Sequence, residues 1–276
     1  MAETGELGAR APSVLLTGAS GVIGAEVARR LAANGAALVL SGRRRERLDR
    51  LAAEIEQAGH GSPAVVTADL GMRGEAARLA EGALGERGRV DVLVNNAGTS
   101  MQGLGWVVGD RDEARAVFEA NLWSPLALIA ALVPGMVERG DGAVVNVGSM
   151  ARVSPFPHLG TYSASRAAIA HATQVLDIEL RPRGVRIVEV ALGPIDTPAS
   201  HENRVLAGAD EWLDGRPGLG EVGAAAAEIV RAVEGDHHGV AHHPRMLRWV
   251  DRFPGLGRRY SQRAARGADL EDETVR

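Results

Sequence analysis

The chain has no cysteine and no lysine among its 276 residues, so all 31 of its basic residues are arginine. Without cysteine it has no disulfide scaffold, no Cys-ligated zinc or iron–sulfur site and no thiol nucleophile. Without lysine it has no Schiff-base chemistry and no phosphate-loop lysine of the NTPases. Several large enzyme classes are thereby excluded before any motif is considered.

Strong charge of either sign is also missing. The 31 basic and 35 acidic residues give a net charge of −4, and apolar residues make up 45% of the chain. This ordinary globular balance excludes bulk disorder, and nothing in it suggests a nucleic-acid partner. Residues 1–12 carry acids and do not resemble a secretory signal, and no run of about 18 uncharged apolar residues is apparent. We therefore expect a soluble, cytoplasmic protein.

Short apolar runs alternate with longer amphipathic segments along most of the chain. The expected strands are residues 13–17, 36–41, 64–67, 90–94, 143–147 and 185–190, and the expected helices are residues 23–33, 45–57, 74–86, 112–138 and 162–181. Fully apolar strands that alternate with helices predict a parallel sheet covered on both faces. The predicted fold class is therefore α/β, a doubly wound Rossmann-type sheet in a single domain.

We place that domain at residues 13–243. A flexible N-terminal tail, residues 1–12, precedes it. A C-terminal extension, residues 244–276, follows it, rich in arginine and ending in a frayed acidic stretch.

A glycine-rich turn follows the first expected strand. Residues 17–24 read TGASGVIG and open the first expected helix, with glycines at positions 18, 21 and 24. These glycines suit a tight turn, a close backbone approach to a pyrophosphate, and helix–strand packing, while the helix N-terminus favours phosphate. A plain strand–helix turn is the simpler alternative, but the position between a strand and a helix favours dinucleotide binding.

The second expected strand ends in Ser41-Gly42-Arg43-Arg44-Arg45. An acidic residue here would bind the adenosine ribose hydroxyls, whereas arginine suits a 2′-phosphate. The sequence therefore predicts a preference for NADP(H) over NAD(H), with Arg43 as the phosphate ligand. A solvated start of the following helix is the alternative.

Seven short motifs occur in order between residues 13 and 200: residues 17–24, Asp69-Leu70, Asn95-Asn96-Ala97-Gly98, Asn121, Ser149, Tyr162-Ser163-Ala164-Ser165-Arg166, and Gly193-Pro194-Ile195-Asp196-Thr197. With these separations the chain resembles the short-chain dehydrogenase/reductase family. The resemblance implies a one-domain oxidoreductase that forms a homodimer or homotetramer.

The resemblance also implies which residues would contact the cofactor. Asp69 and Leu70 would flank the adenine, Asn96 the adjoining ribose, and Ile195 and Thr197 the nicotinamide end. The full expected cofactor set is Gly18, Ser20, Gly21, Ile23, Gly24, Arg43, Asp69, Leu70, Asn96, Gly98, Tyr162, Arg166, Ile195 and Thr197.

The expected catalytic residues are Ser149, Tyr162, Arg166 and Asn121. Tyr162 and Arg166 are four residues apart, so on a helix they share one face. A fixed cation about 4 Å from a phenol favours the phenolate by about 4 kcal/mol at an effective dielectric of about 20, which suits a general acid or base. Ser149 can hydrogen-bond the substrate oxygen, and the resemblance gives Asn121 a place in a water-mediated proton relay. The simple alternatives are a strand-end cap for Ser149, a helix-start aromatic for Tyr162 and a backbone-bonded Asn121.

Arg166 stands where the family usually has lysine, and Leu192 where it usually has proline. Arginine keeps the charge and can bind ribose hydroxyls, but it cannot release a proton at working pH. Two functions therefore remain open. One is an NADP(H)-dependent oxidoreductase that interconverts a ketone or aldehyde with an alcohol, apolar substrates included. The other is a cofactor-binding protein with lost or altered redox chemistry, either a non-redox enzyme or a sensor.

Three further features have competing interpretations. His237, His238, His242 and His243 lie in an expected last strand without a completing carboxylate, so we expect no metal site. Residues 198–220 are expected to be either a substrate lid or a surface helix with Trp212 packed inward.

Residues 244–266 combine seven arginines with apolar residues and are expected to be interrupted at Pro254-Gly255. We favour packing on the domain or on a partner subunit. The alternative is a peripheral membrane or scaffold protein that uses this segment.

Overall fold

The structure, a computed structural model, describes residues 11–198, 200–202 and 220–267. Seven strands form one sheet in the order β3-β2-β1-β4-β5-β6-β7, and every neighbouring pair is parallel. The strands are β1 (Ser13–Leu16), β2 (Ala37–Gly42), β3 (Ala64–Thr67), β4 (Val92–Asn95), β5 (Gly142–Ser149), β6 (Val185–Leu192) and β7 (Gly239–His243). The predicted doubly wound parallel sheet is confirmed.

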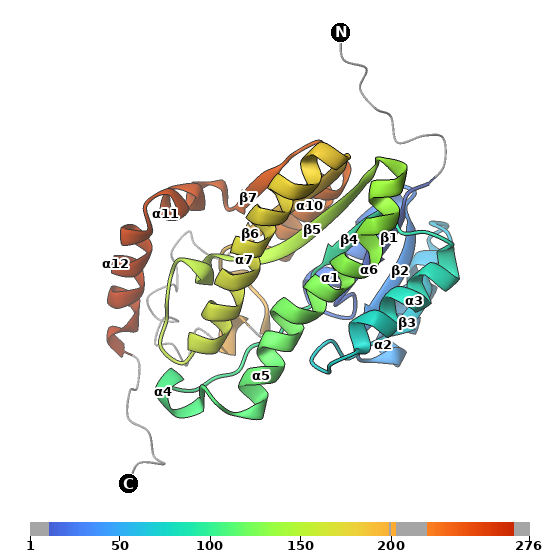
Figure 1. Cartoon of the computed structure of the whole chain (residues 1–276). Coiled ribbons are helices and arrows are strands. Elements are labelled where there is room, and N and C mark those ends of the chain that lie inside the picture. Colours follow the sequence, from blue (N-terminus) through green and yellow to red (C-terminus); the bar gives the residue numbers. More distant parts are fainter. Residues whose placement is uncertain (1–10, 199, 203–219, 268–276) are drawn as a thin grey trace.

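Helices cover both faces of this sheet (Figure 1). One layer holds α1 (Val22–Ala33), α2 (Arg45–Gln57) and α10 (Val222–Glu234). The other holds α3 (Glu75–Arg87), α6 (Ser124–Arg139) and α7 (Gly160–Leu180). The sequence reading did not include α10, whose buried alanine, isoleucine and valine side chains pack on α1 and on the sheet.

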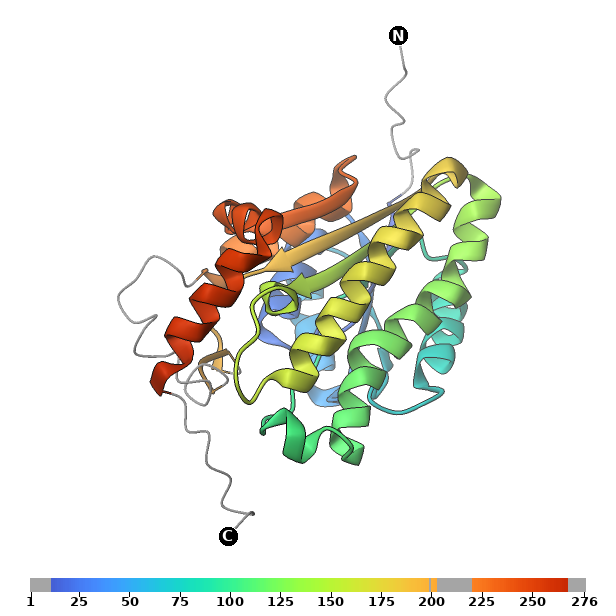
Figure 2. The same ribbon diagram turned by 60° about the vertical axis from the view of Figure 1, so that its left-hand side comes forward.

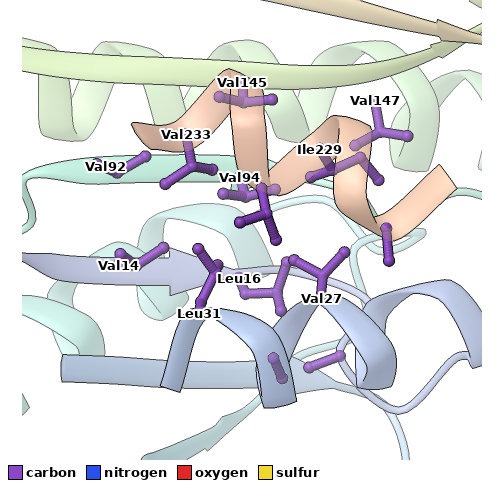
Figure 3. Close-up of a cluster of buried hydrophobic side chains, with 14 of the residues drawn as sticks. Val14, Leu16, Val27, Leu31, Val92, Val94, Val145, Val147, Ile229 and Val233 are labelled. Carbon is purple, nitrogen blue, oxygen red and sulfur yellow. The ribbon is translucent and has the colours of Figure 1, made fainter. Parts of the chain in front are cut away.

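Successive strand residues point to opposite faces, so each strand contributes to two cores. Val14 and Leu16 of β1 belong to the core under α1 and α10, whereas Leu15 belongs to the core under α3 and α6. Figure 3 shows the first of these cores, where Val27 and Leu31 of α1 and Ile229 and Val233 of α10 meet valines of the central strands. Burial on both faces explains why these strands lack the alternating polar pattern of a half-exposed sheet.

The expected helix over 112–138 is one continuous helical run with a wide turn inside it. It consists of α5 (Asp112–Phe118), a π-helical turn η1 (Glu119–Trp123) and α6. By length and composition Asp112–Arg139 could span a membrane, and 56% of its most apolar window is buried inside the fold. The expectation that no such run exists was therefore wrong, and the run packs as a core helix against α3 and β5.

The remaining elements are short. They are α4 (Gly105–Val108), the 3₁₀ turns η2 (Met150–Arg152), η3 (Arg181–Arg183), η4 (Arg245–Leu247) and η5 (Ala265–Gly267), and the helices α11 (Arg248–Arg252) and α12 (Pro254–Ala264).

The expected interruption at Pro254 is confirmed, because α11 ends at Arg252 and Pro254 begins a separate helix, α12. Proline fits the first helical position because its missing N–H has no intrahelical partner there. The described residues leave out residues 1–10 of the expected tail, residues 199 and 203–219 of the expected lid, with Trp212 among them, and residues 268–276 of the acidic end.

Candidate active site

The glycine turn lies at the carboxyl end of β1, beside the loop that follows β4. Gly18 has a φ of +66°, and a Cβ built there would lie 2.8 Å from the Cα of Ala97. A Cβ at Gly24 would lie 2.2 Å from the carbonyl oxygen of Gly18. Because β1 lies between β2 and β4, this is where the winding of the sheet reverses, the usual ligand crevice of such folds.

Thr17 and Asn96 brace this turn. The Asn96 Nδ2 donates to the carbonyl oxygens of Thr17 at 3.0 Å and Gly18 at 3.3 Å. The Thr17 Oγ1 accepts the N–H of Asn96 and of Ala97, each at 3.0 Å, and donates to the Val94 carbonyl at 3.2 Å. The side chain of Asn96, expected beside a ribose, is thus committed to holding the turn.

The N-terminus of α1 is open to an anion. Gly21 is the N-cap and supplies no side-chain cap, and the first turn carries no acidic residue. The first N–H groups of the helix and its positive dipole end therefore lie free toward the turn. Ser20 lies beside the end of β2, since a Cβ at Gly42 would come within 2.8 Å of its Oγ. Ile23 packs partly buried against the core behind the turn. These features fit the pyrophosphate of a dinucleotide.

The arginines after β2 differ in what they contact. Arg45 pairs with Asp49 at 2.8 Å, one turn along α2. Arg43 and Arg44 are exposed, and within the described residues neither has an ion-pair or hydrogen-bond partner for its guanidinium. Arg43 directly follows the last residue of β2. The charge of Arg43 is therefore available to a ligand.

Asp69 and Leu70 follow β3 in a turn held from several sides. The Asp69 N–H donates to Glu75 at 3.2 Å, and its carboxylate accepts the Gly71 N–H at 3.1 Å. The hydrogen bond from Arg78, followed by that from Asp69, lowers the pKa of Glu75 to about 2. Leu70 is buried, and its carbonyl accepts the Ser124 hydroxyl at 2.8 Å. The turn that the resemblance places beside the adenine is therefore fixed to α3 and α6.

Ser149 and Tyr162 lie where β5 leads into α7. Ser149 ends β5 and caps η2, its Oγ accepting the Ala151 N–H at 3.2 Å. Tyr162 lies in the first turn of α7, and both side chains are partly exposed. The hydroxyl of Ser149 keeps its own proton for a further hydrogen bond, so the strand-end cap and a substrate contact are compatible.

Arg166 is 8% exposed and lies inside the fold beneath Tyr162. Its Cζ lies 5.2 Å from the centroid of the Tyr162 ring, and its Nη1 donates to the Val147 carbonyl at 3.2 Å. A Cβ at Gly98 would lie 1.9 Å from its Nη2, so glycine is required there to admit the guanidinium. The buried Nε of Arg166 has no hydrogen-bond partner. Tyr162 and Arg166 share one face of α7, as expected, and the guanidinium lies against the Tyr162 ring.

Asn121 lies fully buried in the π-helical turn η1. Its Oδ1 accepts the Thr99 N–H at 2.9 Å, and its Nδ2 donates to the Thr99 carbonyl and to the Ser165 Oγ, each at 2.9 Å. Ser165 in turn donates to the Tyr162 carbonyl at 2.8 Å. Asn121 therefore ties the loop after β4 to the start of α7, and the wide turn is a common local feature of functional sites.

A buried chain of hydrogen bonds that the sequence reading missed holds α7 on the sheet. Asn95 donates to Asn146 at 2.9 Å, and Asn146 donates to Thr173 of α7, also at 2.9 Å. Asn95 and Asn146 are register partners on β4 and β5. Their isolated polarity within apolar strands was the available signal, because a buried amide is retained only with partners.

Residues 193–197 follow β6 on the same edge of the sheet. Ile195 is buried and pairs with Gly220, and the Thr197 Oγ1 accepts the Ser200 N–H at 3.2 Å. Leu247 of the C-terminal extension packs close to Gly193, 2.6 Å from the position of a Cβ there. The expected nicotinamide side thus shares an edge with Ser149.

A second buried feature missed from the sequence is Glu189, in the centre of β6. It is 1% exposed, and Arg152 of η2 pairs with it at 3.1 Å. Burial raises the pKa of Glu189, and Arg152 opposes that shift. Arg152 also pairs with Asp251 of α11 at 2.7 Å, and Asp251 contacts His242 at 3.0 Å. The hydrogen bond from His242, with help from Arg152, lowers the pKa of Asp251.

The histidines near β7 serve separate contacts. His238 contacts Asp177 at 3.1 Å, whereas His242 contacts Asp251. Burial lowers the pKa of His243. In the part of the chain that the structure describes, no three His, Cys, Asp or Glu side chains gather in a way that could hold a metal.

Comparisons with known proteins agree with this geometry. The family described as short chain dehydrogenase matches residues 12–205. The chain belongs to the short-chain dehydrogenase/reductase family. It is therefore an oxidoreductase of this family, with the Rossmann-type fold described above.

Named relatives include mouse dehydrogenase/reductase SDR family member 7B, 36% identical over 224 residues that make up 79% of this chain and 68% of that protein. A short-chain dehydrogenase from Sphingobium yanoikuyae, solved with NADPH, is 31% identical, with a TM-score of 0.75 over 95% of this chain and 99% of that one. A bulky-bulky ketone specific alcohol dehydrogenase from Comamonas testosteroni is 25% identical, with a TM-score of 0.74 over 96% and 98% of the two chains.

Proposed function

We propose that the protein interconverts a ketone or aldehyde with the corresponding alcohol, using NADP(H). The observation that carries the proposal is that Arg166 lies against Tyr162 at the start of α7, while Ser149 ends β5 at the same edge of the sheet as a glycine turn that would suit a pyrophosphate. The Sphingobium and Comamonas relatives, one solved with NADPH and one named for ketones, support both the cofactor and the substrate class. When bound, the nicotinamide supplies or takes up the hydride.

The chain's own residues would manage the oxygen and its proton. The Ser149 hydroxyl would donate to the carbonyl oxygen and hold it in place. The Tyr162 Oη would deliver the proton to that oxygen during reduction and take it back during oxidation. Arg166 would stabilise the phenolate that remains, as a buried cation against the ring.

The choice of NADP(H) depends on Arg43. It is exposed at the end of β2, and Arg45 beside it is already paired with Asp49. A 2′-phosphate there would meet a guanidinium that has no competing carboxylate partner in the described residues, and arginine binds phosphate in a bidentate fork.

The second candidate is a cofactor-binding protein without efficient redox chemistry. The observation that favours it is the inward position of Arg166, which bonds the Val147 carbonyl and leaves its buried Nε unpartnered. Arginine cannot pass on a proton as lysine can, so a relay through position 166 would be lost. Cofactor binding would survive this change, whereas turnover would not.

Purified wild type, Tyr162→Phe and Arg43→Ala would separate these candidates. We expect wild type to oxidise NADPH with bulky apolar ketones, and Tyr162→Phe to bind NADPH normally with about 10²–10⁴-fold lower turnover. Arg43→Ala is expected to weaken NADPH by about 1.5–3 kcal/mol and leave NADH nearly unchanged. Binding by wild type without turnover of any ketone or aldehyde would favour the second candidate. Equal losses for both cofactors in Arg43→Ala would contradict the role of Arg43.

A further inference from the structure

The C-terminal extension is fixed to the fold along one side. Leu247 packs close to Gly193, and Asp251 pairs with the buried Arg152 at 2.7 Å. In α12, Gly257 is buried so tightly that a Cβ there would lie 2.6 Å from the Val153 carbonyl oxygen. Both views place α12 beside the loop that follows β5 (Figures 1 and 2). Residues 247–257 of the extension therefore pack on the domain beside the turn that follows Ser149.

Its other side presents large apolar side chains to solvent. Met246 is 66% exposed, Trp249 53%, Phe253 52% and Leu256 47%. The Trp249 and Phe253 rings stack 6.3 Å apart with an interplanar angle of 6°. Of the two packing partners expected for this segment, the domain itself does not cover these four side chains, and packing on a partner subunit stays a prediction. Contiguous exposed apolar residues on a folded protein usually mark an interaction site.

The same segment also carries exposed arginines. Arg245, Arg248, Arg252, Arg258, Arg259, Arg263 and Arg266 are all exposed. The guanidinium of Arg248 lies over the Trp249 ring at 5.3 Å. Asp251 is the sole acidic residue in residues 245–266, and it is engaged with Arg152 and His242. The segment thus carries a net charge of +6 in a chain whose total is −4.

We call these seven arginines, with Met246, Trp249, Phe253 and Leu256, the basic aromatic surface. A shallow hollow on it is lined by Arg252, Phe253, Pro254, Gly255, Leu256, Arg258, Arg259 and Gln262. Cationic and apolar groups that meet in one hollow match a lipid, which joins an anionic headgroup to acyl chains.

We propose that the basic aromatic surface docks the protein on an anionic phospholipid bilayer. The exposed aromatic and aliphatic side chains would enter the boundary between headgroups and acyl chains, and the arginines would contact lipid phosphates. A symmetric contact between two copies through this surface would oppose two segments of charge +6, which disfavours a second copy as the occupant. Docking does not depend on whether the site is redox-active.

Vesicle flotation of the full-length protein tests the proposal. We expect binding to vesicles that mix phosphatidylglycerol with phosphatidylcholine, weaker binding as salt rises, and little binding to phosphatidylcholine alone. Arg258→Glu with Arg259→Glu should lower the partition coefficient by at least about 30-fold, because each basic residue near the surface contributes about 1 kcal/mol. The matched control is Arg111→Glu with Arg183→Glu, which makes the same charge change at exposed arginines elsewhere and should shift binding by less than about twofold.

The apolar contribution needs its own variant. Trp249→Ser with Phe253→Ser should lower binding at least about tenfold, whereas Met72→Ser with Leu84→Ser, which removes exposed apolar side chains elsewhere, should not. Trp249 fluorescence should shift to the blue on adding anionic vesicles, and Trp249→Phe should abolish the shift.

Three results would overturn the proposal. The first is no flotation of wild type with anionic vesicles at low salt. The second is that either test variant binds anionic vesicles as strongly as its matched control. The third is a lower oligomeric state of Trp249→Ser with Phe253→Ser in sedimentation velocity without lipid, which would assign the surface to a second copy instead.

Discussion

At the scale of single residues, the site depends on how the guanidinium of Arg166 fits into the space left by Gly98. The guanidinium of Arg166 lies between the Tyr162 ring, the Val147 carbonyl and the backbone at Gly98. Lysine at this position would present a compact ammonium on a flexible stem, with a different reach and no planar head. Positions 98 and 166 therefore have to be considered together.

The Arg166→Lys variant tests what this cation contributes. If electrostatic support of Tyr162 is its role, turnover should stay within about tenfold of wild type, while Arg166→Ala loses about 10²–10⁴-fold. Steady-state kinetics with NADPH and a ketone provides the measurement. An inactive wild type beside an active Arg166→Lys would show that the natural protein binds the cofactor but has lost redox turnover.

The Gly98→Ala variant tests how closely the Arg166 guanidinium packs against Gly98. A Cβ 1.9 Å from the Arg166 Nη2 forces the guanidinium or the loop to move, so we expect a loss of about 1–3 kcal/mol in the free energy of unfolding. The loss should be smaller in an Arg166→Lys background, and a double-mutant cycle in urea measures the difference. Gly85→Ala is the control, since nothing lies within 4 Å of a Cβ at that helical position, and it should cost nothing. Equal losses in both backgrounds would show that the two positions are not coupled.

At the scale of elements, β6 is joined to the turn after Ser149 by a buried ion pair. Arg152 and Glu189 have side chains only 7% and 2% exposed, and the carboxylate also lies against Gly148 of β5. Such a buried pair stabilises the fold little compared with apolar side chains of the same size. Removing only one partner is nevertheless costly, because the other is then a buried, uncompensated charge.

Arg152→Met should therefore destabilise the protein by about 3–5 kcal/mol, because Glu189 loses its partner. Arg152→Met with Glu189→Met should recover most of that loss. Arg29→Met, which breaks an exposed pair with Glu54, should cost less than about 1 kcal/mol. Urea unfolding of the four proteins checks this, and a double variant as unstable as Arg152→Met would contradict the ion-pair explanation.

At the scale of the whole molecule, the charged contacts join the C-terminal extension to the sheet. Asp251 of α11 contacts Arg152 after β5 and His242 of β7, so one cluster joins the extension to the end of the sheet and to a turn about a hundred residues earlier in the chain. The edge of the sheet that carries Ser149 is thereby flanked by the extension, as Figure 2 shows. Stability of the molecule should respond to pH through this cluster.

Asp251→Asn tests that response. The pKa of Asp251 lies below its ordinary value of 3.8, so the ionised carboxylate stabilises the fold above that pH, and the contribution is lost as pH falls through the lower folded-state value. We expect wild type to be more stable than Asp251→Asn at neutral pH and the difference to shrink in acid. Glu189 has the opposite sign, since its raised pKa makes its contribution fall as pH rises, so the measurement compares the two proteins at each pH rather than following wild type alone. A difference independent of pH would contradict this assignment.

The sequence by itself determined the sheet, most of the helices and the order of the site motifs. The apolar runs that form the strands and the glycine turn after β1 are patterns of neighbouring residues, so they can be recognised from the sequence without a structure. The ends of β5 and β6 and the presence of α10 were harder to predict, because small apolar residues suit strands and helices alike.

Only the tertiary structure decided which side chains meet and which stay exposed. That Asn96 braces the glycine turn, that Arg166 fits against Gly98, and that Glu189 pairs with Arg152 all depend on contacts between residues far apart in the chain. The same holds for Trp249 and Phe253, which lie in a segment expected to pack on the domain or on a partner subunit and which the fold leaves exposed. Periodicity fixes which residues share a face, but only packing fixes what that face meets.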